Sequence, residues 1–215
     1  MTNSTQLPPI LATALLALHI AGGTVALLSG LLAMLLDKNK KKHRQVGLVF
    51  FWAMNMVAAS AVALAIAKSN LFLLAIGAFS FYMNFTGYRA IKNKSMKYTR
   101  IDWLVTILAF GTAVFMLSTG NKILLVFGAI LLFLNYRNTK LQWASDEERK
   151  AKRPWRYLAH LGNMSGTYLS AATAFVVVNV NFVKPVWLVW LIPTMIGVPF
   201  IIYFTGVWKK KLHIP

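Results

Sequence analysis

Long apolar segments and short polar connections alternate along the chain, and the apolar segment recurs seven times. The segments cover about residues 10–36, 46–67, 70–91, 101–119, 122–137, 156–181 and 185–208. A helix needs about 20 mainly apolar residues to cross the hydrocarbon core of a bilayer. One such segment could be a buried helix of a soluble protein, but seven in succession are typical of a membrane protein. The pattern therefore predicts an all-α fold, a seven-transmembrane-helix bundle that forms one integral membrane domain over residues 1–215.

Lysine and arginine are distributed unevenly among the connections. The connections after the first, third and fifth segments hold five, five and seven of them, and the C-terminal tail adds Lys209, Lys210 and Lys211. The other connections hold only Lys68, Lys122 and Lys184. Basic residues in short loops mark the cytoplasmic side. We therefore expect a cytoplasmic C-terminus and, because the number of segments is odd, an N-terminus outside. The first segment is expected to be a retained helix and not a cleaved signal peptide, since no basic residue precedes it.

The composition agrees with this interpretation. Of the 215 residues, 58% are hydrophobic and only 13% are charged, whereas a soluble domain is about one quarter charged. A net charge of +18 would suggest nucleic acid as the partner of a soluble protein, but the basic flanks of spanning helices account for it here. We expect the lipid bilayer as partner, with anionic lipid headgroups at the basic connections, and no nucleic acid. The chain has no cysteine, which excludes disulfides and thiolate chemistry.

The connection after the fifth segment has a local signal of its own. Ser145 precedes Glu148 by three residues, the spacing of a capping box, and acidic residues precede basic ones as a helix dipole favours. Two interpretations stay open. One is a short helix on the membrane surface that ends before Pro154, and the other is a solvated linker.

Polar side chains inside apolar segments are costly and therefore informative. His19 lies in the outer half of the first segment, and Gly22, Gly23, Ala26, Gly30 and Ala33 follow it at helical spacing. Small residues at such spacing allow the close approach of a second helix or of a flat cofactor. His19 is thus either a neutral histidine within a tight helix contact or part of a separate polar site.

A second set of polar residues is predicted in the cytoplasmic half. It comprises His43, Asn55, Asn84, His160, Asn163 and Tyr168, and the spacing of His160, Met164 and Tyr168 puts these three on one helical face. We hypothesise that His160, Asn163, Asn84 and Asn55 converge on one cavity that Tyr168 closes toward the midplane. The alternative is a set of separate interhelical hydrogen bonds.

The candidate cofactors follow from the same residues. Facing imidazoles can ligate haem iron, so His43 and His160 are weak candidate metal ligands, and a haem or a quinone could occupy the predicted cavity. A zinc site lacks ligand pairs at suitable spacing. Retinal is not expected, because its Schiff base needs a lysine within the last segment, whereas Lys184 precedes that segment and Lys209 ends it.

The last segment contains Pro193, Gly197 and Pro199. Proline removes a backbone donor and crowds the preceding turn, so the pattern predicts a bent or locally unwound helix between about residues 191 and 197. Such helices line the sites of many transporters, although plain kinks are also common.

Several of these stretches together are similar to a family. Leu18-His19-Ile20, His43-Arg44-x-x-Gly47, the His160 to Tyr168 run, and Trp187 with Pro193-Thr194-x-x-Gly197-x-Pro199 resemble an uncharacterised family of bacterial multi-pass predicted membrane proteins. The His43-Arg44-x-x-Gly47 element is also loosely similar to b-type cytochrome-like membrane proteins. The resemblance implies a bacterial plasma (inner) membrane and no assigned activity.

Three functions stay open at this point. The first is a redox component that binds a cofactor or ligand of haem or quinone type. The second is a small-molecule or proton transporter that uses the seventh helix as its moving part. The third is a non-catalytic membrane scaffold or assembly factor.

Overall fold

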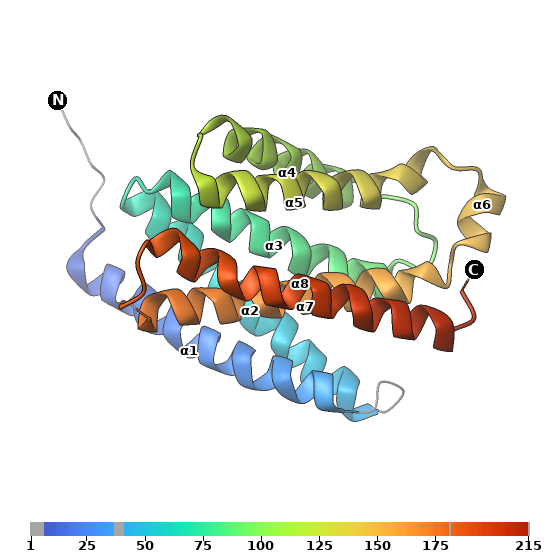
Figure 1. Cartoon of the computed structure of the whole chain (residues 1–215), viewed down its shortest axis with the longest axis horizontal. Helices are drawn as coiled ribbons and strands as arrows, with labels where there is room; N and C mark the ends of the chain where they lie inside the picture. The colour runs from blue at the N-terminus through green and yellow to red at the C-terminus, as the bar shows by residue number, and fades with distance from the viewer. Residues whose placement is uncertain (1–6, 37–40, 181, 215) are drawn as a thin grey trace. The chain divides into compact units, whose positions relative to one another are not determined.

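A computed structural model describes residues 7–36, 41–180 and 182–214. These residues form eight α-helices and one 3-10 turn, and no strand occurs among them (Figure 1). The helices are α1 (Pro9–Leu35), α2 (Lys41–Ala67), α3 (Leu71–Lys92), α4 (Arg100–Ser118), α5 (Lys122–Thr139), α6 (Asp146–Ala151), α7 (Trp155–Asn179) and α8 (Val186–Lys211), and the 3-10 turn η1 spans Lys140–Trp143 between α5 and α6.

Seven of the helices are long and apolar enough to cross a membrane, namely all except α6. Each coincides with one of the predicted apolar segments, and most boundaries agree within a few residues. The largest differences are at basic ends, because hydropathy does not recognise a charged helical turn. α2 already begins at Lys41, α8 continues to Lys211, and, by a smaller margin, α5 continues past Arg137 to Thr139. The all-α prediction is confirmed.

The chain divides into two compact units, an N-terminal unit up to Phe81 and a C-terminal unit from Tyr82, and the boundary falls within α3. In the N-terminal unit α1 and α2 pack as an antiparallel pair. The face of α1 that meets α2 is made of small residues, and Gly22, Ala26 and Gly30 are buried in it. A β-carbon on Gly22 would lie 2.8 Å from the Met56 side chain of α2, so this position permits the close approach.

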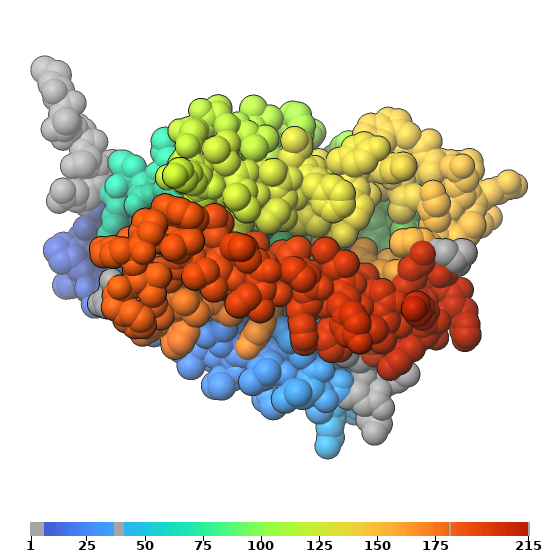
Figure 2. All heavy atoms as spheres, viewed as in Figure 1, coloured from blue at the N-terminus to red at the C-terminus, as the bar shows by residue number. Residues whose placement is uncertain are grey.

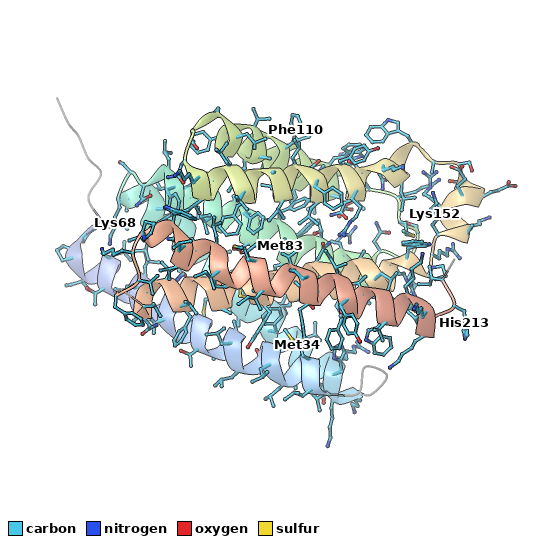
Figure 3. The ribbon with its side chains drawn as sticks, in the orientation of Figure 1. Met34, Lys68, Met83, Phe110, Lys152 and His213 are labelled. Atoms are coloured by element: carbon cyan, nitrogen blue, oxygen red, sulfur yellow. The ribbon has the colours of Figure 1, made fainter. Side chains whose placement is uncertain are left out.

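The C-terminal unit contains two further antiparallel pairs, α4 with α5 and α7 with α8. Gly128 of α5 lies against Met116 of α4, where an added β-carbon would come within 2.9 Å. The C-terminal half of α3 packs on α7. There Gly166 faces the sulfur of Met83, which is labelled in Figure 3, and a β-carbon at Gly166 would be 2.9 Å from it.

Local capping explains where two of the helices begin. α4 starts at a capping box in which Thr99 and Asp102 satisfy each other's backbone, and Asp102 also receives two 2.6 Å hydrogen bonds from Arg89 of α3. α6 starts at a second capping box between Ser145 and Glu148. A short helix is therefore present after the fifth segment, while its place on a membrane surface stays a prediction. The six residues Asp146–Ala151 carry no large apolar side chain.

α8 corrects one expectation. It is α-helical without interruption from Val186 to Lys211, with Pro193 and Pro199 inside it, so the predicted local unwinding does not occur. Each proline deprives one carbonyl of its usual donor, but the helical bonds on both sides of it persist. Gly197 has a packing role, because a β-carbon there would lie 2.5 Å from the Leu169 side chain of α7.

Candidate functional site

A chain of polar side chains joins α3, α5 and α7 in the C-terminal unit. Asn163 of α7 is at its centre and is 2% exposed. Its amide nitrogen donates to the Thr86 hydroxyl of α3 at 3.1 Å, and its amide oxygen accepts from Nη2 of Arg137 of α5 at 2.9 Å. One buried amide thus connects three spanning helices through both of its ends. We call Arg137, Asn163, Thr86 and His160 the polar cluster.

His160 belongs to the cluster because it lies one helical turn before Asn163. Its Nδ1 is 2.9 Å from the backbone oxygen of Gly87. Since a carbonyl oxygen only accepts, Nδ1 carries the proton in this contact. Gly87 makes the approach geometrically feasible, because a β-carbon there would be 2.7 Å from the Met164 sulfur of α7. A hydrogen bond from Nδ1 to a backbone carbonyl fixes both the tautomer and the ring orientation of a histidine.

The cluster extends along α3 and α5 by one further contact. The Asn138 amide nitrogen donates to the Tyr82 hydroxyl at 3.2 Å, and Tyr82 is 1% exposed. Thr86 lies one turn from Tyr82 and donates its hydroxyl to the Tyr82 carbonyl at 2.7 Å. Adjacent residues of α5, Arg137 and Asn138, therefore contact α7 and α3 respectively.

Arg137 has the most unusual environment in the cluster. Among the ion pairs of residues 7–36, 41–180 and 182–214, none includes it. Its assigned contact is to the neutral amide of Asn163, through one of the several N–H donors of its guanidinium. The other arginine near this end of α3, Arg89, has a complete bidentate carboxylate partner in Asp102. Arg137 lies exposed in the last turn of α5, and a cation at the end of a candidate span without an acidic partner is a candidate ligand contact.

Side-chain hydrogen bonds also fix a connection near the cluster. The Gln142 side chain of η1 accepts from the Tyr98 backbone nitrogen at 2.8 Å and donates to the Met96 carbonyl at 3.0 Å. The connection between α3 and α4 is thereby fixed to the end of α5. Burial raises the pKa of the Tyr98 hydroxyl well above its ordinary value of 10.0.

The other predicted site residues lie apart from this cluster or have local partners. In the N-terminal unit, Nδ1 of His19 is 3.1 Å from the Ser60 hydroxyl and 3.2 Å from the Val57 carbonyl of α2. This matches the interpretation of a histidine in a tight helix contact. Nδ1 of His43 is 2.9 Å from the Ala33 carbonyl in the last turn of α1, where backbone acceptors lack helical donors.

The other predicted asparagine sites also lie apart from the cluster or have partners elsewhere. Asn55 donates to the Phe51 carbonyl of its own helix at 2.8 Å, and it belongs to the N-terminal unit. Asn135 donates to the Thr106 carbonyl of α4 at 2.8 Å. Asn84 is 0% exposed, and Tyr168 is half-buried. Of the predicted set, the structure brings His160 and Asn163 together, while convergence on one cavity stays a prediction.

Arg137 and Thr86 were not predicted as site residues. The fifth apolar segment was expected to end at Arg137, which made this residue a loop cation, whereas α5 continues to Thr139. The run Asn135-Tyr-Arg137-Asn138 within a helix was the available signal. For metals, no group of three or more histidine or acidic ligands occurs in the part of the chain that the structure describes.

The fold indicates the class of protein to which the chain belongs. The chain is an all-α protein of the multi-pass helical membrane type, with seven candidate spans. No family model, curated protein or solved structure matches it. The resemblance to a bacterial family of membrane proteins therefore stays a prediction.

Proposed function

We propose that the protein is a membrane component that binds a lipid-soluble ligand at the polar cluster, and that the ligand has a headgroup of quinone type. The observation that carries this proposal is Arg137, an exposed cation in the last turn of the candidate span α5 whose assigned partner is the neutral, buried amide of Asn163. Intramembrane cations are retained where they serve a ligand, an ion path or a relay. A ligand with hydrogen-bond acceptors could accept from the guanidinium N–H groups that do not donate to Asn163.

A quinone headgroup suits these donors. It is an apolar ring with carbonyl oxygens that accept hydrogen bonds, so it needs few donors and an otherwise apolar surrounding. Arg137 supplies the donors, and Asn163 orients it. Asn163 is in turn fixed by Thr86, and His160 fixes α7 against α3. Haem is the alternative ligand of the same redox class, and His160 is then its candidate axial ligand.

The test is to purify the full chain and identify what it carries. Haem gives absorption bands in the visible, and a quinone is recovered by solvent extraction and mass spectrometry. We expect a bound quinone that Arg137→Gln reduces about tenfold, since a charged hydrogen bond contributes roughly 1.5 kcal/mol. Lys140→Gln is the control, because it removes an exposed cation from the adjacent turn η1. Equal ligand content in wild type and Arg137→Gln would contradict the proposal.

A scaffold without chemistry is the second candidate, and specific contacts favour it. His19, His43 and Asn135 each make a hydrogen bond to the neighbouring helix. These residues hold helices together whether or not a ligand binds. A colourless protein with no extractable ligand, in which polar-cluster variants lower only stability, would support this candidate. The transporter interpretation has less support, since α8 is continuous where a moving segment was expected.

The location also belongs to the proposal. The basic residues favour a cytoplasmic position for the connections after α1, α3 and α5 and for the end of α8. A bacterial plasma membrane is what the family resemblance implies. Of these residues, Lys38 and Lys40 lie outside the described part of the chain.

A further inference from the structure

Six cations gather where the beginning of α7 meets the end of α8. They are Lys152, Arg153 and Arg156, followed by Lys209, Lys210 and Lys211, and we call them the α7–α8 basic end. Lys152 and His213, both labelled in Figure 3, mark this end of the C-terminal unit. The antiparallel pairing of α7 and α8 brings them together, and Nζ of Lys209 lies 4.9 Å from the centre of the Trp155 ring across the pair.

Two of the three acidic residues nearest in sequence are engaged in other contacts, and the third, Glu147, forms no ion pair within the described ranges. Asp146 pairs with Lys97 at 3.0 Å and with Arg149 at 2.6 Å, and Glu148 closes the capping box of α6. No ion pair within the described ranges includes any cation of the α7–α8 basic end. Lys152, Arg153, Lys210 and Lys211 are exposed. The surface therefore has a concentration of positive charge that the protein itself does not neutralise.

Aromatic rings lie among these cations. Nζ of Lys211 is 5.1 Å from the Trp208 ring centre, and the Arg156 guanidinium is 4.8 Å from the Tyr157 ring and donates to its hydroxyl at 2.9 Å. Tryptophan and tyrosine prefer the level of the lipid headgroups. Cations with adjacent aromatic rings are thus the arrangement expected at a membrane surface.

An apolar surface continues from this end along α8. Phe200 and Phe204 precede Trp208 at four-residue spacing, which places the three rings on one helical face. Phe200 is 63% and Phe204 is 40% exposed, and their ring centres are 4.6 Å apart. In Figure 2, α8 runs along the viewer's side of its unit with its side chains uncovered. The same helix face therefore carries an apolar stripe that ends at a cation.

We propose that the α7–α8 basic end is a binding site for the headgroup of an anionic phospholipid, with an acyl chain along the Phe200–Phe204 stripe. Lys211 lies on the face of the stripe and Lys209 lies against Trp155 of α7, so the headgroup charge is met from α8 and from the α7 side of this end. A soluble polyanion would use the cations but not the exposed rings beneath them. A neutral lipid would use the rings but would leave the cations without counter-charge. Only an anionic lipid matches both parts.

The test measures lipid retention. The full chain is reconstituted in nanodiscs of equal parts phosphatidylglycerol and phosphatidylcholine, extracted in mild detergent and weighed by native mass spectrometry. We expect phosphatidylglycerol to be retained preferentially. Each cation near an anionic headgroup strengthens binding about fivefold, so Lys209→Gln with Lys211→Gln is expected to lower retention roughly 30-fold. The variant Lys209→Arg with Lys211→Arg keeps both positive charges and is expected to retain the lipid.

The control of equal charge loss is Lys41→Gln with Lys42→Gln at the start of α2, which is expected to retain the lipid as the wild type does. Equal retention of both lipids would leave only an unspecific apolar contact and would overturn the proposal. If the control variant loses the lipid to the same extent, the loss reflects the total positive charge and not this site, and the proposal is overturned. Complete displacement by inorganic phosphate would identify a phosphate site instead of a lipid site.

Discussion

Asn163 illustrates how much a single side chain can determine in a membrane protein. Its amide oxygen and nitrogen each make a contact, one with Arg137 and one with Thr86, at a position that is 2% exposed. Amide groups offer both a donor and an acceptor, so asparagine can connect two neighbours that are themselves unlike.

We expect Asn163→Ala to destabilise the protein by roughly 1–3 kcal/mol, because it removes a buried amide and both of its interhelical hydrogen bonds. The measurement is thermal unfolding of the purified chain in detergent, followed by circular dichroism. Asn55→Ala is the matched control, since the Asn55 amide contacts only the backbone of its own helix. Equal melting temperatures for the two variants would contradict the linking role of Asn163.

The pairing of these residues could be predicted only in part. Polar residues within apolar segments identified His160 and Asn163, since a buried polar group must find a partner. The partners themselves depend on which helix faces meet, and a single sequence does not contain that information. The same limit applies to His19, for which the small residues beside it left a cofactor and a helix contact equally open.

At the scale of the elements, α8 depends on a glycine for its contact with α7. A β-carbon at Gly197 would lie 2.5 Å and 2.6 Å from the two methyl groups of Leu169, whereas one at Gly206 would have no atom within 4 Å. Both substitutions to alanine gain similarly in helix propensity. We expect Gly197→Ala to be less stable than Gly206→Ala by about 1–3 kcal/mol, the usual cost of overpacking. Matching unfolding curves of the two variants would show that Leu169 moves aside.

The short helix α6 allows a prediction about pH. Hydrogen bonds from Arg149 and then Lys97 lower the pKa of Asp146 from its ordinary value of 3.8 to about 2. The charged form is therefore favoured in the folded chain, and its stabilising contribution is present above 3.8 and is lost as the pH falls through about 2. An NMR titration of the Asp146 carboxyl should give a pKa that rises toward 3.8 when Arg149 is replaced by glutamine. An unchanged value would mean that this contact does not hold the carboxylate.

Hydropathy predicted the helices well and their ends less well. A helix is recognised by its apolar length, so basic turns such as the first of α2 and the last of α5 were assigned to the connections. That boundary decided how Arg137 was interpreted. The local unwinding expected at the prolines of α8 does not occur, for a different reason. A helix in an apolar setting keeps every remaining backbone bond, because no water is present to replace a lost one.

At the scale of the whole molecule, the arrangement in a membrane rests on charge. Seven helices are long and apolar enough to cross, and the basic residues concentrate in alternate connections. Lysine and arginine resist translocation, so we expect the side on which they gather to be the cytoplasmic side. The helix ends carry matching features, since Lys209 and Lys211 stack on Trp155 and Trp208 at the end of the C-terminal unit.

The orientation is tested by fusing a reporter that works only in the cytoplasm. Fused after Pro215, it should be active, because α8 ends in three consecutive lysines. Fused at residue 69, between α2 and α3, it should be inactive, because that connection has Lys68 as its only basic residue. A reporter that works only outside the cytoplasm must give the opposite pattern at both positions. Activity of the first reporter at residue 69 and not at the C-terminus would invert the orientation and would place the α7–α8 basic end outside. Activity at both positions would require an even number of spans between them, so one of α3, α4, α5, α7 and α8 would then not cross.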